Sequence, residues 1–277
     1  MSLNKKKINN ITVHRVNLPK IDNNKIKGFD MIPELYANIY VLARKKQGKT
    51  TVLYNIIKEC INKYTKVFFF VSTIDFDPTY KEIMKYLDDH DIEYEKYDSL
   101  NEKENTLTDV MDQMKENVIS ETVDSEDDEK EEDKKPQILN VSEDDETLTV
   151  KIRKYKPRKL TPRHLLIFDD ISDEMRNNKT LRALMKKNRH YKSKIIISTQ
   201  HFTDVNPDIR KMFDIWLLFR DHDDKILKDV YDACCLNISY DQFHTLYKDA
   251  TKDMFNFLFV DKNKCDYRHN FDFKYNL

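Results

Sequence analysis

The segment from Asn38 to Thr51 constrains the fold of this chain more than any other. It consists of a short apolar run, a polar loop that ends in Gly48-Lys49-Thr50, and a stretch with apolar residues at helical spacing. This order is typical of a phosphate-binding loop, whose pattern is G-x-x-x-x-G-K-[ST]. Backbone N–H groups of such a loop and of the following helical turn converge on a phosphate. Gly-Lys-Thr alone also fits an ordinary strand-to-helix turn, so the prediction needs support from the rest of the chain.

The loop pattern predicts a role for several of its side chains. Lys49 should reach the outer phosphates as a point charge, and the Thr50 hydroxyl should complete the coordination of Mg²⁺. Gly48 lets the backbone approach the phosphate where a Cβ would intrude. Ala43 replaces the first glycine of the pattern, so we expect an ordinary φ there and a slightly different entry angle for the loop. The predicted nucleotide-binding residues are Ala43, Arg44, Lys45, Lys46, Gln47, Gly48, Lys49, Thr50 and Thr51.

Polar residues follow two further apolar runs. Asp169 and Asp170 come directly after residues 165–168, which read as a buried strand. Asp169 would contribute to the Mg²⁺ site, and Asp170 would orient or deprotonate the attacking water. Gln200, after the apolar residues 195–197, could sense the γ-phosphate or hold that water. The alternatives are that the aspartates cap a helix and that Gln200 merely caps its strand.

The apolar runs also predict the fold class. Strands should start near residues 38, 67, 164, 194 and 214, with helices between them, and a weaker strand and helix are expected over 92–97 and 107–118. This alternation predicts an α/β fold with a doubly wound, mostly parallel sheet. Ligands bind such sheets at the carboxyl ends of the strands. Four predicted site residues fall at that edge: Lys49, Asp169, Asp170 and Gln200. Their agreement favours an ATPase site over a set of unrelated turns.

Charge divides the chain into regions. We expect a lead-in segment over 1–35 and a nucleotide-binding domain over 36–277, interrupted by an insertion at about 98–160. Residues 124–135 hold eight carboxylates, three lysines and no apolar side chain, so 121–145 is expected to be disordered. Residues 151–163 carry seven basic residues and no acid. This run fits contact with the phosphate backbone of DNA, and it fits charge balance against the preceding acidic run equally well. The candidate DNA-binding residues are Lys151, Arg153, Lys154, Lys156, Arg158 and Lys159.

Composition limits the class of protein. The net charge of −1 provides no overall field that would attract nucleic acid or a membrane surface. The four cysteines show neither metal-ligand spacing nor a disulfide framework, as expected in a reducing compartment. No stretch approaches the ~20 apolar residues that cross a bilayer. We therefore expect a soluble intracellular protein.

Several segments together resemble the genome-packaging ATPases of large DNA viruses and virophages, the poxvirus-type family of the FtsK–HerA superfamily. The most specific feature is Arg189-His190 ahead of Ser198-Thr199-Gln200, because phosphate-loop proteins in general do not carry it. The resemblance spans most of residues 36–277 apart from about 98–160. The segments that carry it are 43–50, 69–73, 165–170, 188–200, 206–210 and 255–261.

The resemblance implies an ATP-driven motor that threads double-stranded viral DNA into a capsid as a homo-oligomeric ring. It implies ATP and Mg²⁺ as cofactors, DNA and portal-vertex capsid proteins as partners, and the host cytoplasm and the virion as locations. In such rings an arginine of one subunit completes the neighbour's site and can speed phosphoryl transfer about 10³–10⁵-fold. Arg189 and Arg210 are the candidates, with Arg182 behind them, although each could equally form a surface ion pair.

Two other functions stay open on the sequence. The chain could be another phosphate-loop enzyme, either a kinase or a helicase-like protein. It could also be a nucleotide-gated scaffold or partner-binding module that hydrolyses little ATP. DNA-stimulated hydrolysis and its turnover number separate these from the motor.

Overall fold

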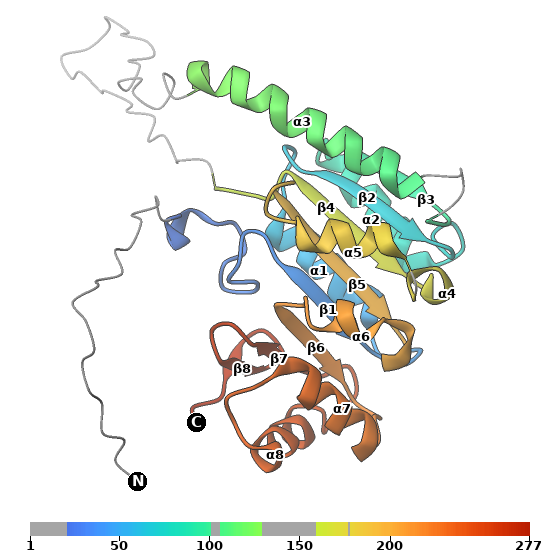
Figure 1. Ribbon diagram of the computed structural model, residues 1–277, viewed down its shortest axis with the longest axis vertical. Helices are drawn as coiled ribbons and strands as arrows, with labels where there is room; N and C mark the ends of the chain where they lie inside the picture. Colours follow the sequence, from blue (N-terminus) through green and yellow to red (C-terminus); the bar gives the residue numbers. More distant parts are fainter. Residues whose placement is uncertain (1–20, 101–105, 129–158, 177) are drawn as a thin grey trace, which may run out of the picture.

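A computed structural model describes residues 21–100, 106–128, 159–176 and 178–277 (Figure 1). Within these ranges the strands form a nine-stranded sheet in the order β3-β2-β4-β5-β1-β6-β7-β8-β9. The strands are β1 (Asn38–Leu42), β2 (Lys66–Val71), β3 (Tyr94–Tyr97), β4 (His164–Asp169), β5 (Ser193–Thr199), β6 (Ile215–Phe219), β7 (Phe257–Asp261), β8 (Asp266–His269) and β9 (Phe273–Lys274).

Strands β1 to β6 run parallel to one another. Tyr40 at the middle of β1 lies opposite Ile197 of β5 on one side and Trp216 of β6 on the other. Strand β4 pairs with β5 and β2, and β3 pairs with β2 at the edge. The predicted doubly wound, mostly parallel α/β fold is confirmed. The strands predicted near residues 38, 67, 164, 194 and 214 are β1, β2, β4, β5 and β6.

The last three strands are antiparallel. Phe257 at the start of β7 lies opposite Phe219 at the end of β6, and Leu258 lies opposite His269 of β8. Short turns join β7 to β8 and β8 to β9, whereas α7 and α8 lie between β6 and β7. Because β7 runs opposite to β6, it begins at the edge of the sheet where β1 and β6 end.

Two helical layers bury the faces of the sheet, which explains why the central strands are continuous apolar runs. Successive side chains of a strand point to opposite faces, so Tyr40 and Leu42 belong to one core cluster while Ile39 and Val41 belong to the other. Helices α1 and α2 cover the Ile39 face, and α3 to α8 cover the Tyr40 face (Figure 1). The helices are α1 (Lys49–Cys60), α2 (Pro78–Asp89), α3 (Thr106–Asp128), α4 (Ser172–Met175), α5 (Lys179–Lys186), α6 (Pro207–Arg210), α7 (Asp224–Cys234) and α8 (Tyr240–Ala250), with 3-10 turns at Asn23–Lys25 and Phe202–Asp204.

Side-chain caps fix where several helices begin. The Asp77 carboxylate accepts the N–H of Thr79 at 2.7 Å, directly before Pro78 in the first turn of α2. Ser239 and Gln242 form a capping box at the start of α8. The cap at Asp77 has a second consequence, because it holds a carboxylate at the carboxyl edge of the sheet.

Helix α3 differs from its predicted form. Its first turns are packed, with Leu107, Val110 and Met114 buried against the Tyr40 face of the sheet. Residues 106–114 therefore contribute to the core of the domain. Extending a nucleated helix costs little, and α3 continues to Asp128, so residues 121–128 are helical where disorder was expected. The rest of the expected disordered segment, 129–145, lies outside the described residues.

Part of the lead-in segment packs against the domain. Ile32 is fully buried, and Ile26 forms a parallel bridge with Leu160. The four cysteines are free thiols, with Cys60 and Cys234 buried. Across the described ranges, the helices are all too short or too polar to cross a bilayer.

Candidate nucleotide-binding site

The loop between β1 and α1 has the backbone shape that its sequence predicts. Lys46 and Gly48 have positive φ values of 63° and 92°, whereas Ala43 does not. Ala43 is fully buried, and its N–H donates to the carbonyl of Thr199 in β5 at 3.1 Å. The residue that departs from the pattern thus continues the strand, and the positive φ values fall later in the loop.

Gln47 links this loop to the end of β6. Its Nε2 donates to the Arg220 carbonyl at 3.2 Å and to Oδ2 of Asp221 at 2.8 Å. Its Oε1 accepts the N–H of Arg44 at 3.0 Å, and only 5% of the residue is exposed. Gln47 therefore fixes the loop both to itself and to the residues that follow β6.

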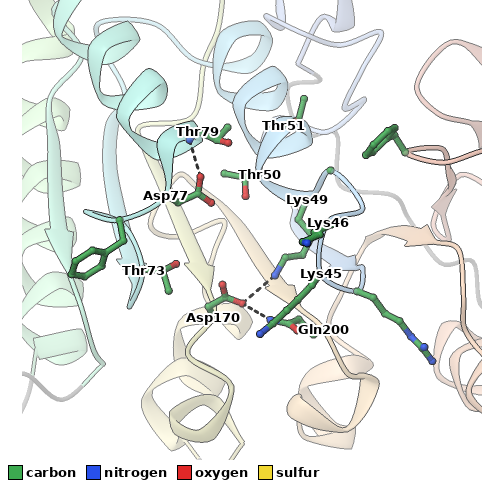
Figure 2. Close-up of a pocket in the computed structure, with 14 residues that line it drawn as sticks. Lys45, Lys46, Lys49, Thr50, Thr51, Thr73, Asp77, Thr79, Asp170 and Gln200 are labelled. Carbon is green, nitrogen blue, oxygen red and sulfur yellow. Dashed lines mark hydrogen bonds and ion pairs between the residues drawn. The ribbon is translucent and has the colours of Figure 1, made fainter.

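Lys49 lies between the two predicted aspartates. Its Nζ is 3.1 Å from Oδ1 of Asp169 and 3.2 Å from Oδ1 of Asp170 (Figure 2). Lys49 is 8% exposed and Asp169 is 1% exposed, so this pair is shielded from solvent. The strand order β4-β5-β1 brings these segments together at the carboxyl edge, as the sequence predicted.

Asp170 is held from two sides. The amide Nε2 of Gln200 donates to its Oδ1 at 3.0 Å, and the Ser72 hydroxyl donates to its carbonyl at 2.9 Å. Asp170 has a φ of 55°, a left-handed conformation that aspartate and asparagine tolerate better than most residues. This turn after β4 points the carboxylate toward Lys49 and Gln200 (Figure 2).

Burial and neighbouring charges set the protonation of the site. Burial raises the pKa of Asp169, and the Lys49 ammonium offsets this only in part. Burial acts the same way on Asp170, but Lys49 and the Gln200 amide outweigh it and lower the pKa of Asp170. Burial lowers the pKa of Lys49, but the two carboxylates outweigh it, so the net pKa of Lys49 is raised and the amine stays charged. Asp170, the less buried of the two aspartates, is thus the stronger acid.

Tyr80 is a member of the site that the sequence did not reveal. Its hydroxyl donates to Oδ2 of Asp169 at 2.9 Å, and the side chain is fully buried. Burial and the Asp169 carboxylate raise the pKa of Tyr80 well above its usual value, so the phenol keeps its proton. In the sequence, Tyr80 looks like any residue on the apolar face of α2.

Replacing Tyr80 with phenylalanine should lower the free energy of unfolding by about 1–3 kcal/mol, because Asp169 would lose a hydrogen-bond donor in a buried place. Urea denaturation of both proteins measures this difference. Tyr86→Phe on the same helix is the control, since Tyr86 is partly exposed and its replacement should change stability by no more than about 0.5 kcal/mol. Equal loss of stability in both variants would contradict the role assigned to Tyr80.

Lys49, Asp170 and Gln200 line a pocket of about 580 Å³, whereas the buried Asp169 and Tyr80 do not. This volume lies within the range of about 300–1,000 Å³ that small-molecule sites occupy. Of the predicted phosphate-loop residues, Ala43 and Gln47 do not line it and the other seven do. Figure 2 shows Thr73, Asp77 and Thr79 on the same side of the pocket as Thr50. Thr73 and Asp77 come from the segment that leads into α2, and Thr79 lies in the first turn of that helix. The lining residues to which the sequence assigned no role in the site are Thr73, Phe76, Asp77, Thr79 and Phe255.

The candidate arginines lie outside this pocket. Arg189 precedes β5, at the end of the strand opposite to Gln200, and lines a separate hollow beside Glu34. The Arg210 guanidinium stacks 3.8 Å from the centroid of the Phe202 ring, and its Nε donates to the Val205 carbonyl at 2.7 Å. Neither arginine acts on the site of its own chain in this arrangement.

The remaining candidates lie at the periphery. Arg182 forms an ion pair with Asp208 at 3.0 Å, with both side chains about half exposed. Lys159 is exposed and its Nζ donates to the Asn24 carbonyl. The other candidate DNA-binding residues, 151–158, lie outside the described residues, so their role stays a prediction.

Comparison with known proteins finds similarity to proteins of viruses. No model of a known protein family matches the chain. A segment of 86 residues is 33% identical to uncharacterized protein 075L of Invertebrate iridescent virus 6, and the match covers 30% of this chain. The chain spans about a third of the length of that relative (33%).

Solved structures match much more of the chain. The DNA-packaging ATPase B204 of Sulfolobus turreted icosahedral virus aligns with a TM-score of 0.53 and 15% identity, over 84% of this chain and 95% of that one. The genome packaging NTPase B204 of Sulfolobus turreted icosahedral virus 2, in complex with sulfate, aligns with a TM-score of 0.50 and 12% identity, over 85% and 96%. The chain therefore has the α/β fold of viral genome-packaging ATPases of the phosphate-loop type.

Proposed function

We propose that this chain is an ATP-hydrolysing motor that moves double-stranded viral DNA into a capsid. The observation that carries the proposal is the meeting of Lys49, Asp169, Asp170 and Gln200 at one edge of the sheet. These residues come from three separate segments, and a chance Gly-Lys-Thr would not gather them. The fold shared with a DNA-packaging ATPase supports DNA as the substrate that is moved, and the partial match to an iridescent-virus protein supports the host cytoplasm as the place of work.

The side chains present fit a nucleotide with Mg²⁺. Mg²⁺ prefers oxygen ligands and is commonly held by one or two carboxylates together with the substrate's phosphates. Asp169 and Thr50 would hold it, and when bound it neutralises charge on the phosphate oxygens. Lys49 now contacts both aspartates. On nucleotide binding, Lys49 would turn its ammonium to the phosphates and leave Asp169 to the ion.

Asp170 and Gln200 are suited to prepare the attacking water. Lys49 and the Gln200 amide lower the pKa of Asp170, so its carboxylate is ionised. When the Lys49 ammonium turns to the phosphates, the loss of that counter-charge would make the carboxylate a better proton acceptor. In the proposed step, water attacks the γ-phosphorus, its proton passes to Asp170, and the bond to the oxygen bridging the β- and γ-phosphates breaks. Gln200 already donates to Asp170, so its amide would report whether the carboxylate is engaged.

Arginines would act between subunits of a ring. Arg189 is the better candidate, because the Arg210 guanidinium is held against Phe202 and bonded to a backbone carbonyl. Arg189 lies at the opposite edge of the sheet from its own Lys49, so it can reach only a neighbour's nucleotide. Capsid proteins at the portal vertex are the proposed docking partners of the ring.

The test is the rate of ATP hydrolysis with and without double-stranded DNA, over a range of protein concentration. We expect DNA to stimulate hydrolysis and the rate per subunit to rise with concentration, because dilution removes an arginine worth about 10³-fold or more in such rings. Mixing Lys49→Ala with Arg189→Ala subunits should restore activity that neither variant has alone. A rate per subunit independent of concentration and of DNA would contradict the motor.

The same assay separates the other functions. Hydrolysis without phosphate transfer to a small acceptor argues against a kinase. Wild-type protein that binds ATP and turns it over no faster than an Asp170→Asn variant would favour the nucleotide-gated scaffold.

A further inference from the structure

The pocket continues past the phosphate loop on the side away from the aspartates. In the sheet order β4-β5-β1-β6-β7, Asp169, Asp170 and Gln200 follow β4 and β5 on one side of β1. Strands β6 and β7 lie on the other side. Because β7 is antiparallel and begins opposite Phe219 at the end of β6, the residues just before it reach the same edge as the loop. Phe255 is two residues before β7 and lines the pocket.

The Phe255 ring lies directly beside the loop. A Cβ built on Gly48 would be 3.4 Å from Cδ1 of Phe255, which is van der Waals contact. Phe255 is nevertheless 59% exposed, so much of its surface is open to a ligand in the pocket. An aromatic ring left open in a pocket beside a phosphate loop is a surface on which a flat apolar group can stack.

The backbone of Phe255 has a conformation that phenylalanine rarely adopts. Phe255 has a φ of 68°, a conformation that is a genuine outlier for a bulky side chain. Its neighbours fix this turn: the Phe257 N–H donates to Oδ1 of Asn270 at 3.1 Å, and Nδ2 of Asn270 donates to Oδ1 of Asn256 at 3.0 Å. Asparagine or glycine would fit this backbone at lower cost, yet the chain has an aromatic residue.

The direction of a bound nucleotide follows from the same order of strands. Its terminal phosphate is drawn to the β4 and β5 side of the loop, where Lys49, Asp170 and Gln200 meet. The opposite end of the molecule, which carries the base, must then leave the loop toward β6 and β7. We propose that the nucleobase of the bound nucleotide stacks on the exposed ring of Phe255. This inference rests on the proposed function, since it takes the pocket to hold a nucleoside triphosphate.

Stacking predicts weak discrimination between bases. Every nucleobase has a π-face, and stacking on an aromatic side chain is tolerant of base identity. Replacing Phe255 with alanine should weaken binding of ATP and of GTP alike, by about 5- to 150-fold. Inorganic tripolyphosphate has no base, so its affinity should not change.

Calorimetric titration of wild type, Phe255→Ala, Phe255→Trp and Met254→Ala with ATP, GTP and tripolyphosphate tests this. Met254 is the matched control, an exposed neighbour (57%) that does not line the pocket. Phe255→Trp should keep the affinity for ATP, and its fluorescence should change with ATP and not with tripolyphosphate. Trp216 is the only other tryptophan in that variant and is buried.

The outcomes separate this inference from the proposed function. If Phe255→Ala binds ATP as tightly as wild type while Lys49→Ala loses both ATP and tripolyphosphate, the nucleotide site stands and stacking on Phe255 is wrong. If Phe255→Ala loses tripolyphosphate as well, the residue shapes the loop and the stacking proposal is overturned. If wild type binds neither ATP nor tripolyphosphate, the proposed function itself fails.

Discussion

Replacing Lys49 with alanine is expected to lower the affinity for ATP about 10- to 100-fold and the rate of hydrolysis about 10²–10³-fold. A charge-assisted hydrogen bond contributes about 1.5–3 kcal/mol, which accounts for the loss of affinity. A preorganised donor aimed at developing charge accounts for the loss of rate. Calorimetric titration and phosphate release measure the two effects separately.

The same change has a structural cost that must be controlled. Without Lys49, the carboxylates of Asp169 and Asp170 would have no counter-charge. Removing one partner of a buried ion pair costs about 3–5 kcal/mol. Affinity is therefore measured where circular dichroism shows the variant folded. Lys58→Ala, an exposed site on the same helix, should leave binding unchanged. ATP binding at wild-type strength by folded Lys49→Ala would remove the phosphate-loop assignment.

Asp170→Asn should reduce hydrolysis about 10²–10⁴-fold while ATP binding survives. The amide has nearly the same shape as the carboxylate and can still accept from Gln200, but it cannot take a proton from water. Asparagine also tolerates the left-handed backbone at this position, whereas alanine would add strain. The loss of hydrolysis would therefore reflect the missing proton acceptor and not a change in the backbone. Single-turnover hydrolysis and titration with ATP make the distinction.

The control for Asp170→Asn is Asp173→Asn. Asp173 is an exposed aspartate in α4, outside the pocket, and its replacement should leave hydrolysis as in wild type. If Asp170→Asn hydrolyses ATP at the wild-type rate, the proton acceptor is another group, and the assigned role of Asp170 is wrong.

The sequence could predict the centre of this molecule because its signals are local. Strands buried on both faces are continuous apolar runs, so β1, β2, β4, β5 and β6 stand out. Parallel strands end at one edge, which predicted that Lys49, Asp169 and Asp170 share that edge. The strand order β4-β5-β1, which the sequence did not predict, brings them into contact. The loop pattern did not predict the positive φ of Lys46, which is not a glycine.

The parts that escaped prediction depend on contacts between distant segments. Tyr80 has the spacing of a core residue on α2, and only the neighbouring β4 shows that its hydroxyl serves Asp169. Phe255 reaches the pocket because β7 is antiparallel, a direction that its apolar residues do not encode. Helix α3 runs into an acidic segment whose composition favoured disorder, because its first turns are fixed by tertiary packing.

A nucleotide that draws the Lys49 ammonium to its phosphates would leave the carboxylates of Asp169 and Asp170 without a counter-charge. A divalent cation that arrives with the nucleotide would supply it. ATP together with Mg²⁺ should therefore bind more tightly than ATP alone, so that recognition of the nucleotide and recognition of its metal are coupled.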